Sequence, residues 1–359
     1  MGARIALIVA AILTGLVALE IGLRLLLPTG TLARWPNYVL EARRVLTGTE
    51  QSRFLHDDLV GYRPRPGFSG ASQNPGFSGV NQSYDARGLR RNGPGPVVDP
   101  EPAGPAPVLV TGDSYTNGED VTDRETWPAH LEQLLGRPVL NGGVSGYGFD
   151  QSVLRAEALA AATKPAAIVV AFIADDINRT EMHRIWGAEK PYFDIESDRL
   201  VLRNVPVPPS PDPRTTLNIW QRTLGYSFLF DFILRRLDLL HNWFGDHVRV
   251  HPAGDGERIA CLLTGRLKAL QQQSGAPVLV VAQYDPVVWQ DPAFEAEQRR
   301  LTRGLLACAK ERGLAVLDSF GTLAASGDPR RLYGLWHMND AGNLLTAEMV
   351  AAQLRGVLH

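Results

Sequence analysis

The sequence contains little cysteine and no excess of charge of either sign. Only Cys261 and Cys308 occur in the 359 residues, which excludes a disulfide framework and a cysteine-rich metal site. The 36 basic and 38 acidic residues give a formal net charge of −2, so nothing suggests a nucleic-acid-binding protein or a charged disordered tail. Both cysteines fall in stretches with a helical pattern, and we expect two buried free thiols. Export to an oxidising compartment would instead allow a disulfide.

One long apolar run lies near the amino terminus. From Ile5 to Leu27 the polar interruptions are Thr14, Glu20 and Arg24. A helix rises about 1.5 Å per residue, so this run is long enough to cross a hydrocarbon layer of about 30 Å. Glu20 and Arg24 stand four residues apart and can pair on one helix face, which favours an uncleaved anchor. A removed signal peptide is the alternative, because Thr31-Leu32-Ala33 offers small residues for cleavage.

The next stretch is irregular. Residues 60–106 are dense in glycine and proline, which resist regular helix, and the part from 93 to 107 reads as a linker. Phe68, Phe77 and Tyr84 indicate that the earlier part packs on something. The sequence therefore predicts an anchor at 1–28, a juxtamembrane and linker region at 29–106, and a folded domain at 107–359.

From Pro107 onward, apolar runs alternate with helical patterns. The apolar, β-rich runs are 108–111, 139–141, 167–173, 278–282 and 315–318, and the helical patterns are 129–135, 152–162, 258–273, 295–312 and 341–358. Continuous apolar strands separated by helices are typical of a parallel sheet covered on both faces. We expect an α/β fold, a three-layer α/β/α sandwich with a five-stranded parallel sheet, preceded by one transmembrane helix.

One insertion, at about 180–255, interrupts this alternation. It holds a proline-rich segment, 205–213, and an apolar helix near 219–244. The apolar arc of that helix is wider than one surface face, which predicts burial against the main domain. A lid over a groove, or contact with the membrane surface or a membrane-protein partner, are the alternatives.

The chemistry-bearing residues follow strand ends. Gly112-Asp113-Ser114 ends the first apolar run and presents a hydroxyl at the carboxyl end of a buried strand, where open α/β sheets bind ligands. Ser114 is the best candidate nucleophile, although such turn residues often end strands without any chemistry. A serine hydroxyl needs a nearby base, and His337 is the natural one because its loop opens the last helix.

The order of these motifs resembles the SGNH (GDSL-type) hydrolase family. Over about 107–359 it runs from Gly112-Asp113-Ser114 through Asn141-Gly142-Gly143 and Asp175-Asp176 to His337, and the anchor and Gly61-Tyr62-Arg63-Pro64 look like a membrane-anchored bacterial branch. The resemblance implies a serine nucleophile and an oxyanion site formed by the backbone N–H groups of Ser114 and Gly143 and by the side chain at Asp175. It implies no metal and no organic cofactor.

The sequence departs from the family pattern twice. The family has asparagine where Asp175 stands, and an ionised carboxylate would oppose an oxyanion unless burial keeps it protonated. The family also has an aspartate two or three residues before the histidine, where this sequence has Leu335 and Gly334. A Ser–His dyad could still act, and Asp318 or Asp328 could replace the missing carboxylate.

We therefore expect a membrane-anchored serine esterase or O-acyl transferase acting on acyl esters. By resemblance, the esters are those of carbohydrate or cell-envelope glycan, and the domain faces the periplasm from a single pass of a bacterial inner membrane. Arg34, Arg43 and Arg44 beyond the helix argue mildly against export, although large domains translocate despite such charges. The alternative is a catalytically degenerate subunit that serves as a scaffold in a membrane complex.

Overall fold

The computed structural model describes residues 2–26, 35–44, 52–71, 80–93 and 104–358. They divide into two compact units, each described by itself. Unit 1 comprises Met1–Ser52, Arg184–Ala188 and Pro209–Val248, and unit 2 comprises Arg53–His183, Glu189–Pro208 and Arg249–His359.

A five-stranded parallel sheet forms the centre of unit 2, which confirms the expected fold class. Its strands are β5 (Val108–Thr111), β6 (Val139–Asn141), β7 (Ala167–Phe172), β13 (Val278–Ala282) and β14 (Ala315–Asp318). They lie in the order β14-β13-β7-β5-β6, and every neighbouring pair is parallel. The order reverses between β5 and β7, and the carboxyl ends beside such a switch point are where open sheets bind ligands.

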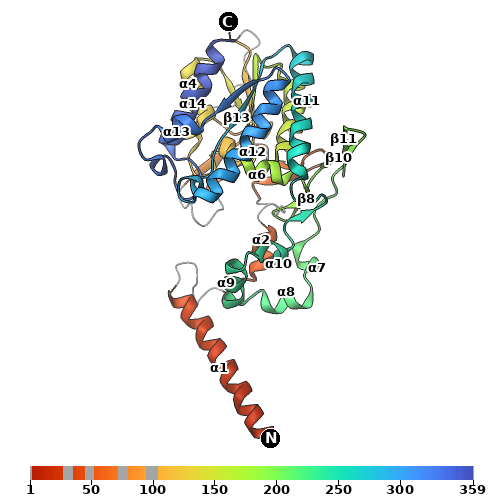
Figure 1. Ribbon diagram of the computed structural model, residues 1–359, viewed down its shortest axis with the longest axis vertical. Coiled ribbons are helices and arrows are strands. Elements are labelled where there is room, and N and C mark those ends of the chain that lie inside the picture. Colours follow the sequence, from red (N-terminus) through yellow and green to blue (C-terminus); the bar gives the residue numbers. More distant parts are fainter. Residues whose placement is uncertain (1, 27–34, 45–51, 72–79, 94–103, 359) are drawn as a thin grey trace. The chain divides into compact units, whose positions relative to one another are not determined.

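Helices cover both faces of this sheet (Figure 1). On one face α4 (Trp127–Leu135) packs on α14 (Asp340–Arg355), and on the other α5 (Phe149–Thr163), α11 (Asp255–Ser274) and α12 (Pro292–Glu311) lie side by side. The layer under α4 and α14 includes Trp127 and Val350, both fully buried. Burying one such side chain contributes about 1.5–3 kcal/mol, so this layer is a main source of the unit's stability.

The ends of α4 show why the sequence is helical there. Thr126 accepts a hydrogen bond from the N–H of Ala129 at 3.2 Å, and Pro128 stands in the first turn, where its missing N–H costs nothing. Gly136 ends the helix with a left-handed φ of 58°, a conformation that glycine adopts without steric penalty.

The two cysteines form a disulfide, so the expectation of two free thiols is wrong. Cys261 on α11 and Cys308 on α12 have Cα atoms 5.4 Å apart and are bonded to each other. Helical periodicity could not show this, because the two cysteines are 47 residues apart in sequence and their pairing depends on how α11 and α12 pack.

From Arg53 onward the segment before the sheet belongs to unit 2, within the region 29–106 that the sequence suggested as juxtamembrane and linker. It forms the antiparallel pairs β1 (Phe54–Asp57) with β2 (Gly61–Pro64) and β3 (Ser69–Ala71) with β4 (Asn81–Ser83). Tyr62 is 1% exposed and packs edge-on against Tyr147. Of the residues singled out earlier, Phe77 lies outside the described residues, as does most of the expected linker at 93–107.

The apolar stretch of the insertion is not one helix. It forms α8 (Ile219–Leu224), α9 (Phe228–Arg236) and α10 (Leu240–Phe244). Ser227 begins α9 by accepting from the N–H of Phe230, and Asp238 has a left-handed φ of 54°. The helical pattern of apolar residues continues across these breaks, so it could not reveal them.

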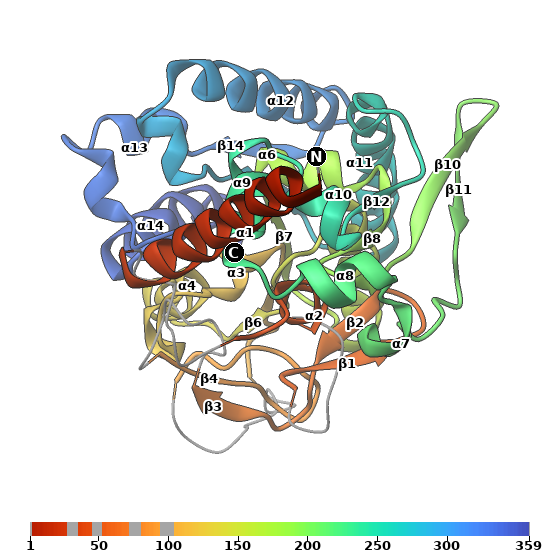
Figure 2. The ribbon, with the colours of Figure 1, turned by 90° about the horizontal axis from the view of Figure 1, so that it is seen from below.

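The other elements are short. They are α2 (Tyr38–Arg44), α3 (Ser114–Asn117), η1 (Asp123–Glu125), α6 (Ala174–Arg179), β8 (Met182–Ile185), β9 (Ala188–Glu189), α7 (Pro213–Thr216), β12 (Val248–Arg249), η2 (Pro286–Trp289), α13 (Phe320–Ala324) and η3 (Pro329–Leu332). The hairpin of β10 (Tyr192–Glu196) and β11 (Arg199–Arg203) extends from unit 2 (Figure 2).

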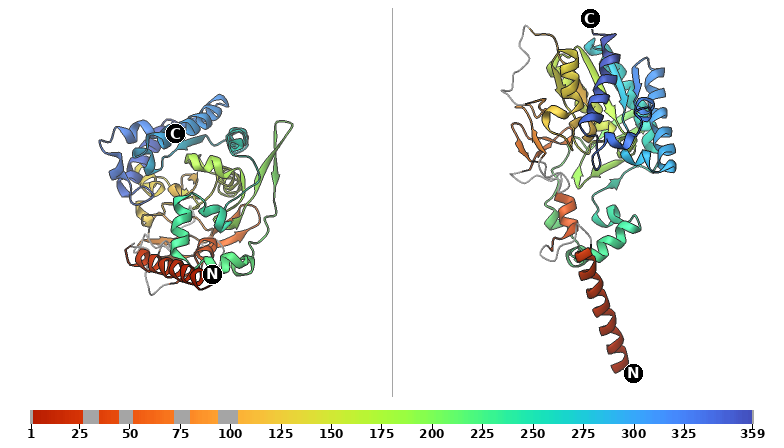
Figure 3. Two further views of the ribbon diagram at one scale, coloured as in Figure 1. Left: turned by 60° about the horizontal axis from the view of Figure 1, so that its bottom comes forward. Right: turned by 90° about the vertical axis from the view of Figure 1, so that its left-hand side faces the viewer.

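In unit 1, α1 (Gly2–Leu26) is one continuous helix (Figure 3). Its mean hydropathy of 2.4 and its length suffice to cross a membrane, a test that a signal sequence also passes. The alternative cleavage residues Thr31-Leu32-Ala33 lie outside the described residues.

Candidate active site

Ser114 lies at the carboxyl end of β5, at the switch point of the sheet. It is the first residue of α3, which Asp113 caps by accepting a hydrogen bond from the N–H of Tyr115 at 2.9 Å. The tight turn requires Gly112, because a Cβ atom there would lie 2.3 Å from Thr116 Oγ1 and 2.8 Å from the carbonyl oxygen of Ala171. This turn holds the Ser114 hydroxyl at the sheet edge.

His337 contacts Ser114, so the structure brings these two expected residues together. The Nε2 atom of His337 lies 2.9 Å from Ser114 Oγ. The other ring nitrogen, Nδ1, lies 3.0 Å from Asp120 Oδ1, and the backbone N–H of His337 donates to Asp120 Oδ2 at 3.0 Å. Because a carboxylate only accepts, this network assigns the ring proton to Nδ1 and leaves Nε2 able to accept from Ser114.

Asp120 is the carboxylate that the sequence analysis missed. Asp318 accepts instead from the hydroxyl of Tyr284, and Asp328 pairs with Arg330, so neither of the two candidate replacements holds His337. A Cβ atom on Gly334 would lie 3.7 Å from Asp120 Oδ2. The Asp120 carboxylate therefore lies beside the position at which the family carries its aspartate. The available signal was an acidic residue six positions after Ser114, on a loop at the same sheet edge.

Glu119, next to Asp120, holds the loop that carries Asp120 in place through its side-chain hydrogen bonds. Its side chain accepts from Arg53 Nη1 at 2.7 Å, from Asn117 Nδ2 at 3.1 Å and from the Ser145 hydroxyl. Burial alone would raise the pKa of Glu119, but the charge of Arg53 and these hydrogen bonds lower it to about 2. Glu119 is therefore ionised at any physiological pH, and its contacts fix the backbone that carries Asp120.

Residues from the segment before the sheet hold the same loop. Gln82 donates to the carbonyl oxygen of Glu119 at 2.9 Å. The guanidinium of Arg90, 2% exposed, donates to the carbonyl oxygens of Asn117, Gly118 and Val121 at 3.0–3.3 Å. The site therefore depends on a segment that the sequence analysis placed outside the domain.

The pKa of His337 is raised above its ordinary value. Burial by itself would lower the pKa, but the hydrogen bond and charge of Asp120, together with the charges of Glu119 and Asp113, outweigh it. The ring of Tyr115 packs edge-on against His337 with centroids 5.0 Å apart, and the Tyr115 hydroxyl donates to the Trp336 carbonyl oxygen. These contacts orient the imidazole, and the nearby carboxylates favour its protonated form.

The expected oxyanion donor Gly143 is occupied. Its backbone N–H donates to Asn141 Oδ1 at 3.0 Å. The backbone N–H of Ser114, the other expected backbone donor, makes no hydrogen bond to any residue that the structure describes.

Asp175 and Asp176 lie in the first turn of α6 and have different environments. Asp176 is fully buried, accepts from the N–H of Ile173, and pairs with Arg179 at 2.6 Å. Burial, with the charge of Asp113, raises the pKa of Asp176. Asp175 is half-buried and makes no hydrogen bond within the described part of the chain, although its charge acts on Arg179 and Tyr115. Within the described residues, Asp175 thus makes no hydrogen bond to Ser114.

Unit 1 contains a cluster of two histidines and one aspartate. His241, Asp246 and His247 in unit 1 have potential ligand atoms within 4.8 Å of one another, and both imidazoles present Nδ1 to Asp246 Oδ1 at 3.2 and 3.1 Å. The cluster belongs to unit 1, whereas Ser114 belongs to unit 2.

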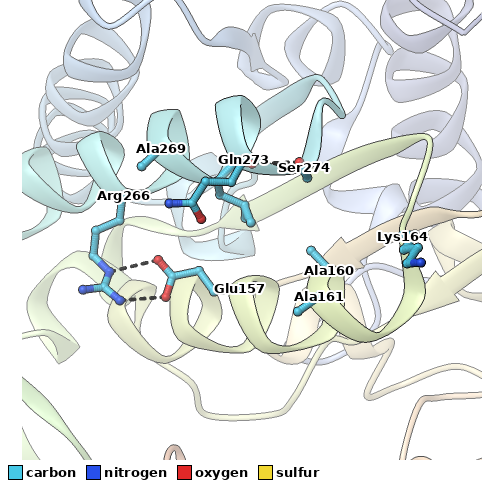
Figure 4. A pocket seen from close by; sticks show the side chains of 9 residues that line it. Glu157, Ala160, Ala161, Lys164, Arg266, Ala269, Gln273 and Ser274 are labelled. Carbon is cyan, nitrogen blue, oxygen red and sulfur yellow. Dashed lines mark hydrogen bonds and ion pairs between the residues drawn. The ribbon is translucent and has the colours of Figure 1, made fainter.

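A groove of about 800 Å³ lies between α5 and α11 (Figure 4). The pair Glu157–Arg266 crosses it at 2.7–2.9 Å. Its lining contains neither Ser114 nor His337, so it is not the place of the chemistry; it consists of Glu157, Ala160, Ala161, Lys164, Arg266, Ala269, Leu270, Gln273 and Ser274.

The fold and this geometry define an α/β protein with a serine, a histidine and a carboxylate in hydrogen-bond contact at the carboxyl edge of a parallel sheet. Residues 110–345 match the model of the GDSL-like Lipase/Acylhydrolase family, and the chain belongs to that family. No curated relative matches the sequence.

Several solved structures are similar to this chain. LAE5, an alpha/beta hydrolase enzyme from the metagenome of Lake Arreo, is 14% identical, with 72% of this chain and 98% of that chain covered and a TM-score of 0.44. TesA is 17% identical, with 70% and 99% covered and a TM-score of 0.39. A catalytic mutant of the acetylxylan esterase Axe2 from Geobacillus stearothermophilus is 15% identical, with 70% and 94% covered and a TM-score of 0.39.

Proposed function

We propose that the protein is a serine esterase or O-acyl transferase in which Ser114 is the nucleophile, His337 the general base and Asp120 the residue that orients His337. One observation carries the proposal. The chain of hydrogen bonds from Asp120 through His337 to Ser114 has distances of 3.0 and 2.9 Å, which is the contact that an activated serine requires.

Each atom of this chain has a defined part in acyl transfer. The Ser114 oxygen attacks the acyl carbon while its proton passes to His337 Nε2, and Asp120 stabilises the imidazolium that forms. The tetrahedral intermediate collapses as His337 returns the proton to the leaving alcohol. Water, or the hydroxyl of an acceptor, then reverses the sequence and releases Ser114. The backbone N–H of Ser114 is the donor that we assign to the developing oxyanion.

The pH dependence of ester hydrolysis tests this function. The base must be neutral to accept a proton, and the pKa of His337 is raised above its ordinary value of 6.5. We expect kcat/KM for a short p-nitrophenyl ester to rise with pH through a single midpoint above 6.5 and then to level off. A rate independent of pH over this range, or the absence of hydrolysis by the purified protein, would contradict the proposal.

Asp175 takes the place of an amide donor in the family pattern, and we propose that it slows the reaction by opposing the developing oxyanion. Asp175→Asn is expected to raise kcat, because a neutral donor replaces a carboxylate; the loss of one such donor elsewhere costs ~10²–10³ in rate. The matched control is Asp285→Asn, because Asp285 is also an acidic group near the site. A rate for Asp175→Asn equal to or below that of the wild type would show that Asp175 has another role.

The Asp120 carboxylate supports the enzyme over a degenerate scaffold. The scaffold alternative rested on Asp175 and on the missing aspartate before His337, and Asp120 supplies a carboxylate for the second of these. By family resemblance, the substrate is an acyl ester on carbohydrate or cell-envelope glycan. Release of acetate from O-acetylated envelope glycan by the wild type, and not by Ser114→Ala, would support this class; release of none would restrict the substrate to other esters.

We further propose that α1 anchors the protein in a bacterial inner membrane with unit 2 in the periplasm. The apolar length of α1 supports an anchor, and the Cys261–Cys308 disulfide suits an oxidising compartment. When alkaline phosphatase is fused to the carboxyl terminus, phosphatase activity is expected, since alkaline phosphatase folds only when it is exported. If the phosphatase fusion were inactive and a fusion to a cytoplasmic reporter were active, unit 2 would lie in the cytoplasm.

A further inference from the structure

Unit 1 carries an exposed apolar surface on two short helices of the insertion. Seven large apolar side chains of α8, α9 and the turns that follow them are 39–66% exposed: Ile219, Trp220, Leu224, Tyr226, Ile233, Leu237 and Leu239. A monomeric soluble surface rarely exposes so many large apolar groups within about twenty residues. The arginines Arg222, Arg235 and Arg236 are interspersed with them and are also exposed.

The same helices are fastened to the carboxyl-terminal end of α1 (Figure 1). The Glu20 carboxylate of α1 accepts from the backbone N–H groups of Phe228 and Leu229 at 2.8 and 2.7 Å and from the Ser227 hydroxyl at 3.0 Å. A residue of α1 therefore caps the first turn of α9, where negative charge is stabilising.

Arg24 completes the connection. It pairs with Glu20 at 2.6 Å, donates to the Tyr226 carbonyl oxygen at 2.8 Å, and places its guanidinium 3.8 Å from the centre of the Trp35 ring. Its side chain is fully buried. The polar pair that interrupts the apolar run of the sequence is thus the joint between α1 and the turn from α8 to α9.

The position of this joint along α1 gives the depth of α8 and α9. A rise of about 1.5 Å per residue puts Glu20 about 27 Å from Gly2, close to the thickness of a hydrocarbon layer of about 30 Å. Side chains of α1 before Glu20, such as Leu13 at 57% exposed, then lie in the hydrocarbon. Tryptophan, tyrosine and arginine are the residues that favour the level at which such a helix leaves the membrane.

We propose that α8 and α9 lie in the lipid–water interface beside the end of α1, with their exposed apolar side chains among the acyl chains and the arginines at the lipid phosphates. The proposal rests on the membrane anchoring proposed above and adds a second lipid-binding surface to it. The Glu20 cap and the Arg24 joint fix where unit 1 meets the membrane, so that the insertion forms an interfacial lipid contact beside the anchor.

Spin labels on the full chain in phosphatidylcholine–phosphatidylglycerol vesicles test this. Single cysteines are introduced as Leu13→Cys in α1, Trp220→Cys in α8 and Leu237→Cys after α9, with Leu344→Cys in unit 2 as the exposed leucine control. All four replace side chains that are 39–65% exposed, so the fold is not disturbed. The measured quantity is the collisional accessibility of each label to oxygen, which partitions into lipid, relative to a water-soluble nickel chelate.

The labels at 220 and 237 are expected to show an oxygen-to-nickel ratio several-fold above that at 344, and the label at 13 a higher ratio still. A high ratio at 13 with ratios at 220 and 237 equal to that at 344 would contradict the interfacial contact of α8 and α9 and would leave the proposed anchor unaffected. A ratio at 13 equal to that at 344 would contradict both the anchor and the interfacial contact.

Discussion

Ser114→Ala is expected to lower kcat for short p-nitrophenyl esters by ~10⁴–10⁶ while the thermal unfolding transition stays nearly unchanged. The reason is that no other hydroxyl lies within hydrogen-bond distance of His337 Nε2 in the described part of the chain. The Ser114 hydroxyl itself contacts only His337 and, at 3.4 Å, Asp113, so its removal takes little from the fold.

Ser326→Ala is the matched control, because Ser326 is exposed and bonds only to the Leu323 carbonyl oxygen. It should hydrolyse the ester at the wild-type rate. If Ser114→Ala retained the activity of this control, Ser114 would have no part in the reaction and the proposed function would fail with it.

Asp120→Asn is expected to lower kcat by ~10⁴, because an amide at this place no longer fixes the proton on His337 Nδ1 or stabilises the imidazolium. The midpoint of the pH–rate profile should also fall, because Asp120 is the main group that raises the pKa of His337 against burial. A merely structural role for Asp120 would lower activity without moving this midpoint.

The position of the Asp120 carboxylate offers a sharper test by relocation. Asp120→Ala should be inactive, and adding Gly334→Asp should restore part of the activity, because a Cβ atom on Gly334 points toward the space that Asp120 vacates, 3.7 Å from its Oδ2 atom. Adding Leu335→Asp instead should restore nothing, since the Leu335 side chain is 60% exposed. Equal rates for the two double variants would contradict the idea that Asp120 replaces the family's aspartate from another loop.

The sheet could be predicted from the sequence because its signal is local. Each buried parallel strand is a short apolar run between helical patterns, and β5, β6, β13 and β14 have the expected bounds. Ser114 and His337 could be found for the same reason, since each follows from its place at a strand end or helix start.

The parts that sequence reasoning missed depend on tertiary contacts. Asp120 is 217 residues from His337, and no pattern along the chain relates them. The region 29–106, expected to be juxtamembrane and linker, contains Arg53, Gln82 and Arg90. Their side chains are buried around Glu119 and the carbonyl groups of the active-site loop.

The replacement of the carboxylate has a physical explanation. An imidazole needs one acceptor at Nδ1, and any loop that brings a carboxylate to that atom meets the requirement. Here Asp120 also accepts from the His337 backbone N–H, so a single carboxylate holds both the ring and the loop that carries it. The pattern of the family can therefore lose an aspartate in sequence while the site keeps one in space.

The central claim is that Ser114 is an activated nucleophile, and labelling by a fluorophosphonate probe tests it most directly, because the probe requires a nucleophilic serine and no knowledge of the substrate. The purified protein is treated with the probe at pH 8, digested and analysed by mass spectrometry. The account predicts one modified peptide, with the phosphonyl group on Ser114, and no labelling after Asp120→Asn within the time that saturates the wild type. An unmodified Ser114 in the folded wild-type protein, or a label confined to another residue, would contradict it.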